Sequence, residues 1–221
     1  MSKIVRVWDL PTRLFHWALV ACVLGLVVTA YLPGTWIVWH SRLGYAVLAL
    51  LLFRIVWGVV GGRWSRFASF IYSPASLVRY LKGKPHPDHL IGHNPLGAGS
   101  VFAMLAFLLA QVATGLVSDD EIAFTGPLNR FVATGKGLAA TWYHKEVGKW
   151  ILAGLIVLHV LAILYYLRSK KDNLIRPMIQ GDKAVGHDAI SSRDDAGSRG
   201  AALAVFALSC ALVYWLVSLG G

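Results

Sequence analysis

Charged residues are scarce in this chain. Asp, Glu, Lys and Arg make up 14% of its 221 residues, whereas hydrophobic residues make up 57%. Mean hydropathy is +0.60. A soluble globular domain carries about 25% charged residues, so this composition excludes that class and predicts a polytopic membrane protein.

Cysteine is also scarce. The two cysteines, Cys22 and Cys210, both lie inside apolar runs, and neither a CxxC nor a CxxCH motif occurs. A thiolate metal site and a covalently attached c-type haem are therefore not indicated. We expect both cysteines to behave as small hydrophobic residues that face lipid or another helix.

Five apolar runs are long enough to cross a bilayer. Asp9 and Pro11 suit the start of the first helix, and Asn94 with Pro95 suits the start of the third. We predict an all-α integral membrane protein, a transmembrane helical bundle with a four-helix core and a fifth C-terminal helix. The predicted spans are residues 14–32, 40–60, 96–118, 142–168 and 201–219, with a polar connection at 119–141 and an irregular charged stretch at 169–200.

Basic residues predict the orientation. They precede the first span and follow the second and fourth, whereas the opposite side carries the acidic cluster Asp119, Asp120 and Glu121. The positive-inside rule then makes the N-terminus cytoplasmic and the C-terminus periplasmic. The same rule accounts for the net charge of +10, so we do not expect a nucleic-acid partner. The basic residues on the predicted cytoplasmic side are Lys3, Arg6, Arg13, Arg63, Arg66, Arg79, Lys82, Lys84, Arg168, Lys170, Lys171, Arg176 and Lys183.

Four histidines lie at matched depths in these spans. His144 and His159 are about 22 Å apart along one helix and only about 60° apart around it. With the predicted orientation, His16 shares the inner depth with His159, and His40 shares the outer depth with His144. Two neutral imidazoles on opposite faces of an iron form a b-type haem site. A single membrane histidine is more often an interior hydrogen-bonding residue, but four at matched depths predict two non-covalent haems b.

Two further residues are candidates for cofactor contact. Arg54 lies in the apolar middle of LLLFRIVWG, where a guanidinium is costly. A haem propionate at the inner site would supply its counter-charge, and the alternative is an arginine that extends to the cytoplasmic interface. His93, in GHNPLG at the start of the third span, is a candidate for contact with a propionate or a quinone.

Glycines within the spans would let a flat porphyrin approach the backbone, and the candidates are Gly25, Gly44 and Gly115. Each of them, taken singly, also fits close packing of helices through small residues. The HPDH sequence at residues 86–89 resembles a metal-binding pair, but no further ligands are evident, so we expect a solvated loop.

Several stretches of the sequence together form a specific pattern. They are VWDLPTRLFHW (7–17), WHxxxG (39–44), FRIVWGVVG (53–61), RFASF (66–70) with Pro74, and GHNPLG (92–97), with the two histidines of the fourth span. In these stretches the chain resembles the prokaryotic di-haem b-type cytochromes, a family that includes nickel–iron hydrogenase cytochrome b subunits and small bacterial cytochromes b-561. The resemblance covers about residues 4–175. It implies two haems b ligated from the first, second and fourth spans in the bacterial inner membrane, and by motif the ligands fall on His16, His40, His144 and His159.

The resemblance assigns residues 1–180 to a di-haem domain, leaving a cytoplasmic linker at 181–200 and an additional helix. The expected function is electron transfer between a periplasmic c-type cytochrome, dehydrogenase or hydrogenase and the membrane quinone pool. The acidic cluster at 119–121 would steer a basic partner, or it is an ordinary solvated loop. Alternatives are a stand-alone quinol or superoxide oxidoreductase and a non-redox transporter or anchor. The sequence leaves homodimer formation open.

Overall fold

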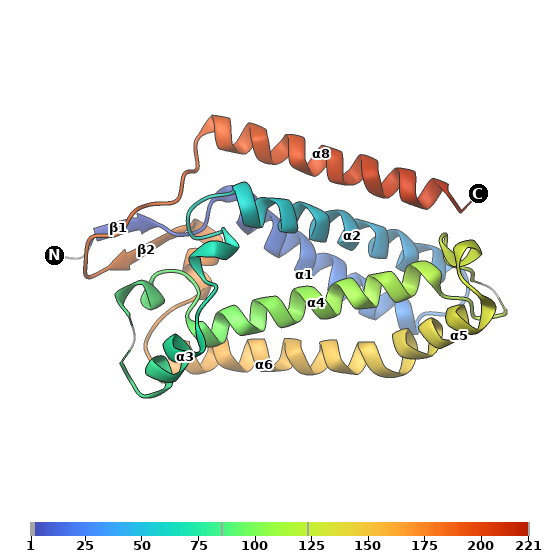
Figure 1. Cartoon of the computed structure of the whole chain (residues 1–221), viewed down its shortest axis with the longest axis horizontal. Helices are drawn as coiled ribbons and strands as arrows, with labels where there is room; N and C mark the ends of the chain where they lie inside the picture. Colours follow the sequence, from blue (N-terminus) through green and yellow to red (C-terminus); the bar gives the residue numbers. More distant parts are fainter. Residues whose placement is uncertain (1–2, 85, 123, 221) are drawn as a thin grey trace. The chain divides into compact units, whose positions relative to one another are not determined.

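A computed structural model describes residues 3–84, 86–122 and 124–220, and the helices dominate this part of the chain (Figure 1). Within it, five helical stretches are long and apolar enough to cross a membrane. The prediction of an all-α membrane protein is therefore confirmed. The long helices are α1 (Leu10–Tyr31), α2 (Trp36–Val60), α4 (Pro95–Val117), α6 (Lys149–Arg168) and α8 (Ala196–Ser218).

Two of these helices begin as the sequence indicates. Asp9 caps α1, because its Oδ1 accepts a hydrogen bond from Thr12 N at 2.8 Å. Asn94 caps α4 in the same way, accepting from Gly97 N at 2.8 Å. In both cases the side-chain oxygen binds an amide that has no partner within the helix.

The polar connections contain more regular structure than their composition suggests. Residues 134–168 form one continuous helical stretch, in which α5 (Thr134–Trp142) leads through the π-helical turn η4 (Tyr143–Gly148) into α6. The expectation of an irregular stretch at 169–200 is wrong in part. That stretch holds α7 (Ile175–Gln180) and β2 (Asp182–Val185), which pairs antiparallel with β1 (Lys3–Arg6) (Figure 1). The other short helices are α3 (Pro74–Leu81), η1 (Phe67–Ser69), η2 (Pro87–Leu90) and η3 (Asn129–Phe131).

The chain divides into two compact units, and each long helix contributes residues to both. The first unit comprises Met1–Phe15, Arg54–Ala103 and Val157–Ala204, and the second comprises His16–Phe53, Met104–Ile156 and Val205–Gly221.

The first unit is built around the β1–β2 pair. Its apolar core comes from both strands, from the residues that follow β1 and from the connections after α2 and η2. The buried members are Val5, Val7, Trp8, Trp64, Ile91 and Val185. Gly181, which has φ +92°, precedes β2, and its carbonyl accepts hydrogen bonds from Val7 N and Trp8 N at 2.8 and 3.1 Å. The segment after α6 is therefore fastened to the segment before α1.

An ion cluster around Asp194 reinforces this fastening. Asp194 accepts hydrogen bonds from Arg6 Nη1 at 2.6 Å, Arg199 Nε at 3.0 Å and Leu10 N at 3.2 Å. Burial by itself would raise the pKa of Asp194, but the bonds from Arg199, Leu10 N and Arg6 outweigh it and hold that pKa below its usual value.

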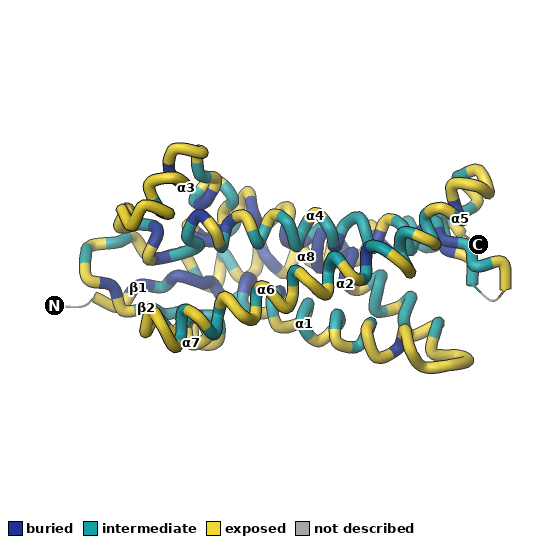
Figure 2. The backbone as a smooth tube through the Cα atoms, turned by 90° about the horizontal axis from the view of Figure 1, so that it is seen from below, coloured by how far each residue is buried: buried dark blue, intermediate teal, exposed yellow. Residues whose placement is uncertain are grey.

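The second unit has a core of aliphatic side chains from three helices. Its buried members are Val47, Leu48, Ala49 and Leu51 of α2, Leu108, Val112 and Leu116 of α4, and Val213 of α8. None of the residues of α6 is buried in either unit, and Figure 2 shows this helix in the colours of exposed and intermediate residues. Exposed apolar side chains along a helix of this length suit contact with lipid.

Candidate histidine sites

The second unit brings two of the four predicted histidines together. The ring centroids of His40, near the start of α2, and His144, in η4, are 6.1 Å apart, with an angle of 79° between the ring planes. A metal–imidazole bond of about 2.0 Å and a ring radius of ~1.1 Å would place the centroids of two trans ligands ~6.2 Å apart. The spacing therefore fits two axial ligands on one iron.

Both rings are held by the main chain of a neighbouring helix. His40 Nδ1 lies 3.1 Å from Leu26 O of α1, and His144 Nδ1 lies 2.9 Å from Gln111 O of α4. Because a carbonyl only accepts, each Nδ1 carries the proton. In a neutral imidazole the lone pair is then on Nε2, which is the nitrogen available to a metal.

A threonine accompanies each of these contacts. Thr29 Oγ1 lies 3.3 Å from His40 Nδ1, and Thr114 Oγ1 lies 3.3 Å from His144 Nδ1. In both helices the threonine follows the accepting carbonyl by three residues, so it lies on the same helical face. The two histidines therefore have closely similar surroundings, contributed by α1 and by α4.

The three candidate glycines differ in their surroundings. A Cβ at Gly115 would approach His144 Cε1 to 3.1 Å, so the glycine allows this ring to lie against α4. A Cβ at Gly25 would come within 2.8 Å of Leu43 Cδ1, which favours close packing of α1 against α2. A Cβ at Gly44, one helical turn beyond His40, would meet no atom within 4 Å, and this leaves room for a flat ring.

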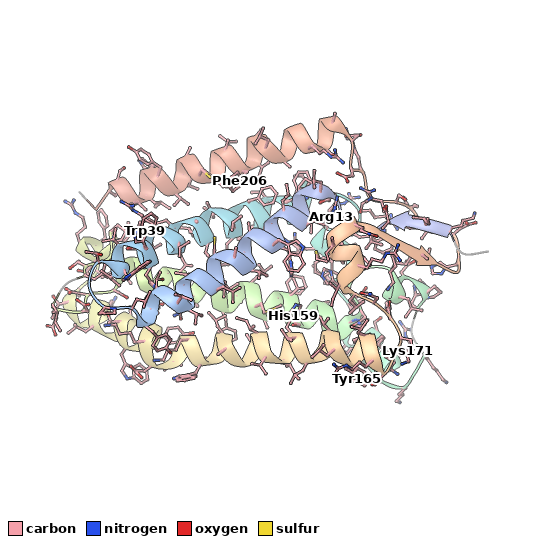
Figure 3. The ribbon with its side chains drawn as sticks, turned by 180° about the vertical axis from the view of Figure 1, so that it is seen from behind. Arg13, Trp39, His159, Tyr165, Lys171 and Phe206 are labelled. Atoms are coloured by element: carbon pink, nitrogen blue, oxygen red, sulfur yellow. The ribbon has the colours of Figure 1, made fainter. Side chains whose placement is uncertain are left out.

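His16 and His159 belong to different units. His16 is a half-buried residue of α1 in the second unit. His159 is a half-buried residue of α6 in the first unit, and Figure 3 labels its side chain on that helix. Their pairing stays a prediction.

Arg54 of the first unit is almost completely buried, with 3% of its surface exposed. Its guanidinium lies 4.6 Å from the centre of the Phe67 ring, and its Nη1 has no hydrogen-bond partner among the described residues. Gly58 permits this arrangement, since a Cβ there would lie 2.1 Å from Phe67 Cε2. A buried cationic donor of this kind suits a carboxylate such as a haem propionate.

Asp9 does more than cap a helix. It is fully buried, and besides Thr12 N it accepts hydrogen bonds from Ser65 Oγ at 2.9 Å, Gly62 N at 3.0 Å and Trp57 Nε1 at 3.2 Å. It also interacts electrostatically with Arg54. The sequence pattern gave only its capping role, although Asp9, Arg54 and Trp57 lie in the stretches that resemble the cytochromes.

His93 and the HPDH stretch lie in the first unit. The His93 ring packs against Trp8 and Phe70, with centroid distances of 4.7 and 4.5 Å. The expectation that the HPDH stretch is a solvated loop is wrong for His89, which is buried with 5% of its surface exposed, whereas His86 is exposed as expected. The Nδ1 of His89 accepts a hydrogen bond from His86 N at 3.2 Å, which closes the turn η2.

The acidic cluster of the second unit has a local structural role. Asp119 Oδ1 accepts from Glu121 N at 2.9 Å, and Asp120 Oδ1 accepts from Ile122 N and Phe124 N at 3.1 and 2.9 Å. These bonds satisfy backbone amides in the loop. They favour the solvated-loop interpretation over steering of a partner.

Comparison with known proteins places the chain in a family. The family model described as prokaryotic cytochrome b561 matches residues 7–181. The chain is also 23% identical to the probable Ni/Fe-hydrogenase 1 B-type cytochrome subunit of Escherichia coli K12, over 85% of this chain and 94% of that protein. Probable Ni/Fe-hydrogenase B-type cytochrome subunits of Bradyrhizobium diazoefficiens and Azotobacter chroococcum are 24% and 27% identical, over 81% and 80% of this chain and 85% and 87% of theirs.

The chain belongs to the prokaryotic cytochrome b561 family, because that match covers most of its length. It is therefore a multi-pass membrane cytochrome that transfers electrons through haem b.

Proposed function

We propose that this member of the cytochrome b561 family carries electrons across the bacterial inner membrane through two non-covalent haems b. One haem is ligated by His40 and His144, and the other by His16 and His159. The observation that carries the proposal is the 6.1 Å spacing of the His40 and His144 rings, which would let both imidazoles hold one haem iron.

Main-chain carbonyls hold both histidines of the site formed by His40 and His144 in the tautomer that can bind a metal. The carbonyls of Leu26 and Gln111 hold the protonated Nδ1 of each histidine, so both Nε2 atoms offer a lone pair without a change of tautomer. Leu26 packs against the aliphatic core of the same unit, which would help to keep water from the bound haem. When bound, haem b supplies one-electron chemistry, which axial ligation and burial tune.

Arg54 is proposed to bind a propionate of the haem held by His16 and His159. Its burial and its Nη1 without a partner among the described residues support this role. His93 is proposed to contact quinone, because its imidazole presents a hydrogen-bonding group among the aromatic rings of Trp8 and Phe70, against which a quinone ring can pack. Gly44 is proposed to face the porphyrin, since the space beside it is open.

The redox partner is proposed to be a nickel–iron hydrogenase on the periplasmic side, with the quinone pool as acceptor. The support is that the similar proteins are named as cytochrome subunits of such hydrogenases. The basic residues that flank the spans support a cytoplasmic N-terminus and a periplasmic C-terminus.

Haem content tests the ligand assignment. We expect about two haems per wild-type chain and about one after His40→Ala, His144→Ala, His16→Ala or His159→Ala. The double variant His40→Ala/His144→Ala should keep one haem, because both changes affect the same site, whereas His40→Ala/His16→Ala should lose both. His187→Ala, outside the spans, is the matched control and should keep two.

The double variants decide the pairing. Loss of both haems from His40→Ala/His144→Ala, with one retained by His40→Ala/His16→Ala, would refute the assignment of ligands to pairs.

The partner is tested in native membranes. Dihydrogen should reduce both haems, and His144→Ala should abolish electron delivery from dihydrogen to quinone. Reduction by a short-chain quinol but not by dihydrogen would instead favour the stand-alone quinol oxidoreductase.

A further inference from the structure

The π-helical turn η4 places His144 in unusual backbone geometry. The turn spans Tyr143–Gly148 and interrupts what is otherwise a continuous helix. π-Helical turns are rare, because their i→i+5 hydrogen bonds widen the helix, and they are frequent at functional sites. Something must therefore stabilise this turn at the position of a candidate ligand.

Gln111 of α4 makes two contacts with His144. Its side-chain Nε2 donates to His144 O at 3.0 Å, and its main-chain oxygen lies 2.9 Å from His144 Nδ1. One residue thus holds both the backbone and the ring of the histidine. The opposite ligand lacks this second contact, because Leu26, which offers the carbonyl to His40, has an apolar side chain.

The side-chain amide of Gln111 is oriented by the hydrogen bond that its Nε2 donates. Its Oε1 is buried and has no hydrogen-bond partner among the described residues, which is a cost in an apolar core. The opposite amide orientation would place Oε1 against His144 O, and two acceptors repel each other. The geometry is therefore explained by the bond to His144 O.

Gly148 completes the arrangement. A Cβ at this position would lie 2.0 Å from Gln111 Oε1 and 2.9 Å from Tyr143 Cε1. A side chain here would displace the Gln111 amide. Glycine is otherwise unfavourable within a helix, so its place in η4 suits the close approach of Gln111.

We propose that Gln111 is a positioning residue for His144, and that it sets the orientation and donor strength of this ligand and hence the midpoint potential of the haem held by His40 and His144. The proposal rests on the ligation proposed above. A hydrogen bond from Nδ1 to a carbonyl makes the imidazole a stronger donor and favours the oxidised iron. Without the side-chain bond from Gln111 to His144 O, the histidine should be held less firmly and its Nδ1 bond to Gln111 O should weaken. The midpoint potential of this haem alone should therefore rise.

The test is a redox titration of the full-length, haem-loaded protein carrying Gln111→Met, which keeps the side-chain length and removes the amide. We expect both haems to be retained. At a fixed ambient potential, the reduced-to-oxidised ratio of one haem should rise about tenfold, equivalent to about 59 mV for one electron. The low-spin electron paramagnetic resonance signal of that haem should shift, and the other haem's should not. Ser209→Ala, which removes a buried helical hydroxyl of the same unit, is the control and should change neither haem.

Gly148 supplies an independent test through a double-variant cycle. Gly148→Ala should reproduce the shift in the wild-type background by displacing the amide, although Gly→Ala ordinarily favours a helix. In a Gln111→Ala background, where the amide is absent and only the contact with the Tyr143 ring remains, Gly148→Ala should add no further shift. An equal additional shift in that background would overturn the proposal.

Other outcomes separate this proposal from the function on which it rests. Unchanged potentials and spectra in Gln111→Met, with two haems bound, would overturn the positioning role and leave the ligation intact. Equal shifts of both haems, together with a lower melting temperature, would mean a general packing role and would also overturn it. Retention of two haems by His144→Ala would refute the ligation itself.

Discussion

Replacement of Asp9 by Asn should destabilise the first unit by about 3 kcal/mol. The carboxylate accepts from Thr12 N and Trp57 Nε1 on Oδ1, and from Gly62 N and Ser65 Oγ on Oδ2. An asparagine keeps one acceptor oxygen, and its NH2 group faces the other two donors. Ser65 can rotate to accept, but the buried amide of Gly62 is left without a partner.

The magnitude follows from these contacts. A stranded buried donor costs about 1–3 kcal/mol, and bonds to a neutral oxygen are weaker than bonds to a carboxylate by roughly 1 kcal/mol. For a chain of this size, 1 kcal/mol corresponds to a shift of about 2–4 °C in melting temperature. A decrease of ~6–12 °C is therefore expected.

Thermal unfolding in detergent, followed by circular dichroism and tryptophan fluorescence, measures this change. Asp188→Asn is the matched control, because Asp188 is an exposed acid that pairs with Lys3 at the surface, and it should shift the melting temperature by about 2 °C at most. A shift of the same small size in Asp9→Asn would refute the view that Asp9 organises the first unit.

The interaction between Asp9 and Arg54 can be tested in the same way. Asp9→Asn leaves the buried Arg54 without the acid with which it interacts. The same change should therefore cost about 1 kcal/mol less in an Arg54→Met background, which a double-mutant cycle measures. Strict additivity would show that the two charges do not stabilise each other.

Two further changes test the structure elsewhere. Gly126→Ala should lower the melting temperature by about 4 °C or more, because its Cβ would lie 2.4 Å from the main-chain oxygen of Leu116, which cannot move aside cheaply; unchanged stability would contradict this packing. Asp194→Asn should destabilise the protein more at pH 7 than at pH ~2, because the pKa of Asp194 in the folded protein lies below its unfolded value of ~3.9. The stabilisation by its carboxylate is therefore present above that pH and decreases as the pH falls toward the lower folded pKa. A melting-temperature difference from wild type that is the same at both values of pH would refute that contribution.

The long helices could be predicted from the sequence because apolar length and capping residues act locally. Asp9 and Asn94 cap α1 and α4 through contacts within four residues of each helix start. The same local rules cannot reveal the β1–β2 pair, whose partners Lys3 and Val185 are far apart in the chain. That sheet depends on the return of the chain after α6, and polar composition alone gives no sign of it.

The depths of the histidines in the candidate site could be predicted from the sequence, but the backbone geometry around His144 could not. Depth along the helices placed His40 and His144 at the same level, and the structure brings their rings together. The regular-helix angle of about 60° between His144 and His159 assumed unbroken α-geometry, which the π-turn η4 interrupts. The wider turn is contacted by Gln111 of another helix, whose Nε2 donates to His144 O, and the residues of η4 alone do not reveal that contact.

The hydrogen bonds that orient His40 and His144 come from residues that the sequence analysis did not single out. Each Nδ1 bonds a carbonyl that precedes a threonine by three residues, at Leu26 with Thr29 and at Gln111 with Thr114. Threonine in a transmembrane helix is ordinarily satisfied by its own helix, so neither residue stood out in the sequence. The rotation of α1 and α4 turns these carbonyls toward the histidines and fixes the same tautomer twice. The orientation of these two candidate ligands is therefore set by helices that carry neither His40 nor His144, and substitutions on those helices should affect the haem proposed between them without touching it.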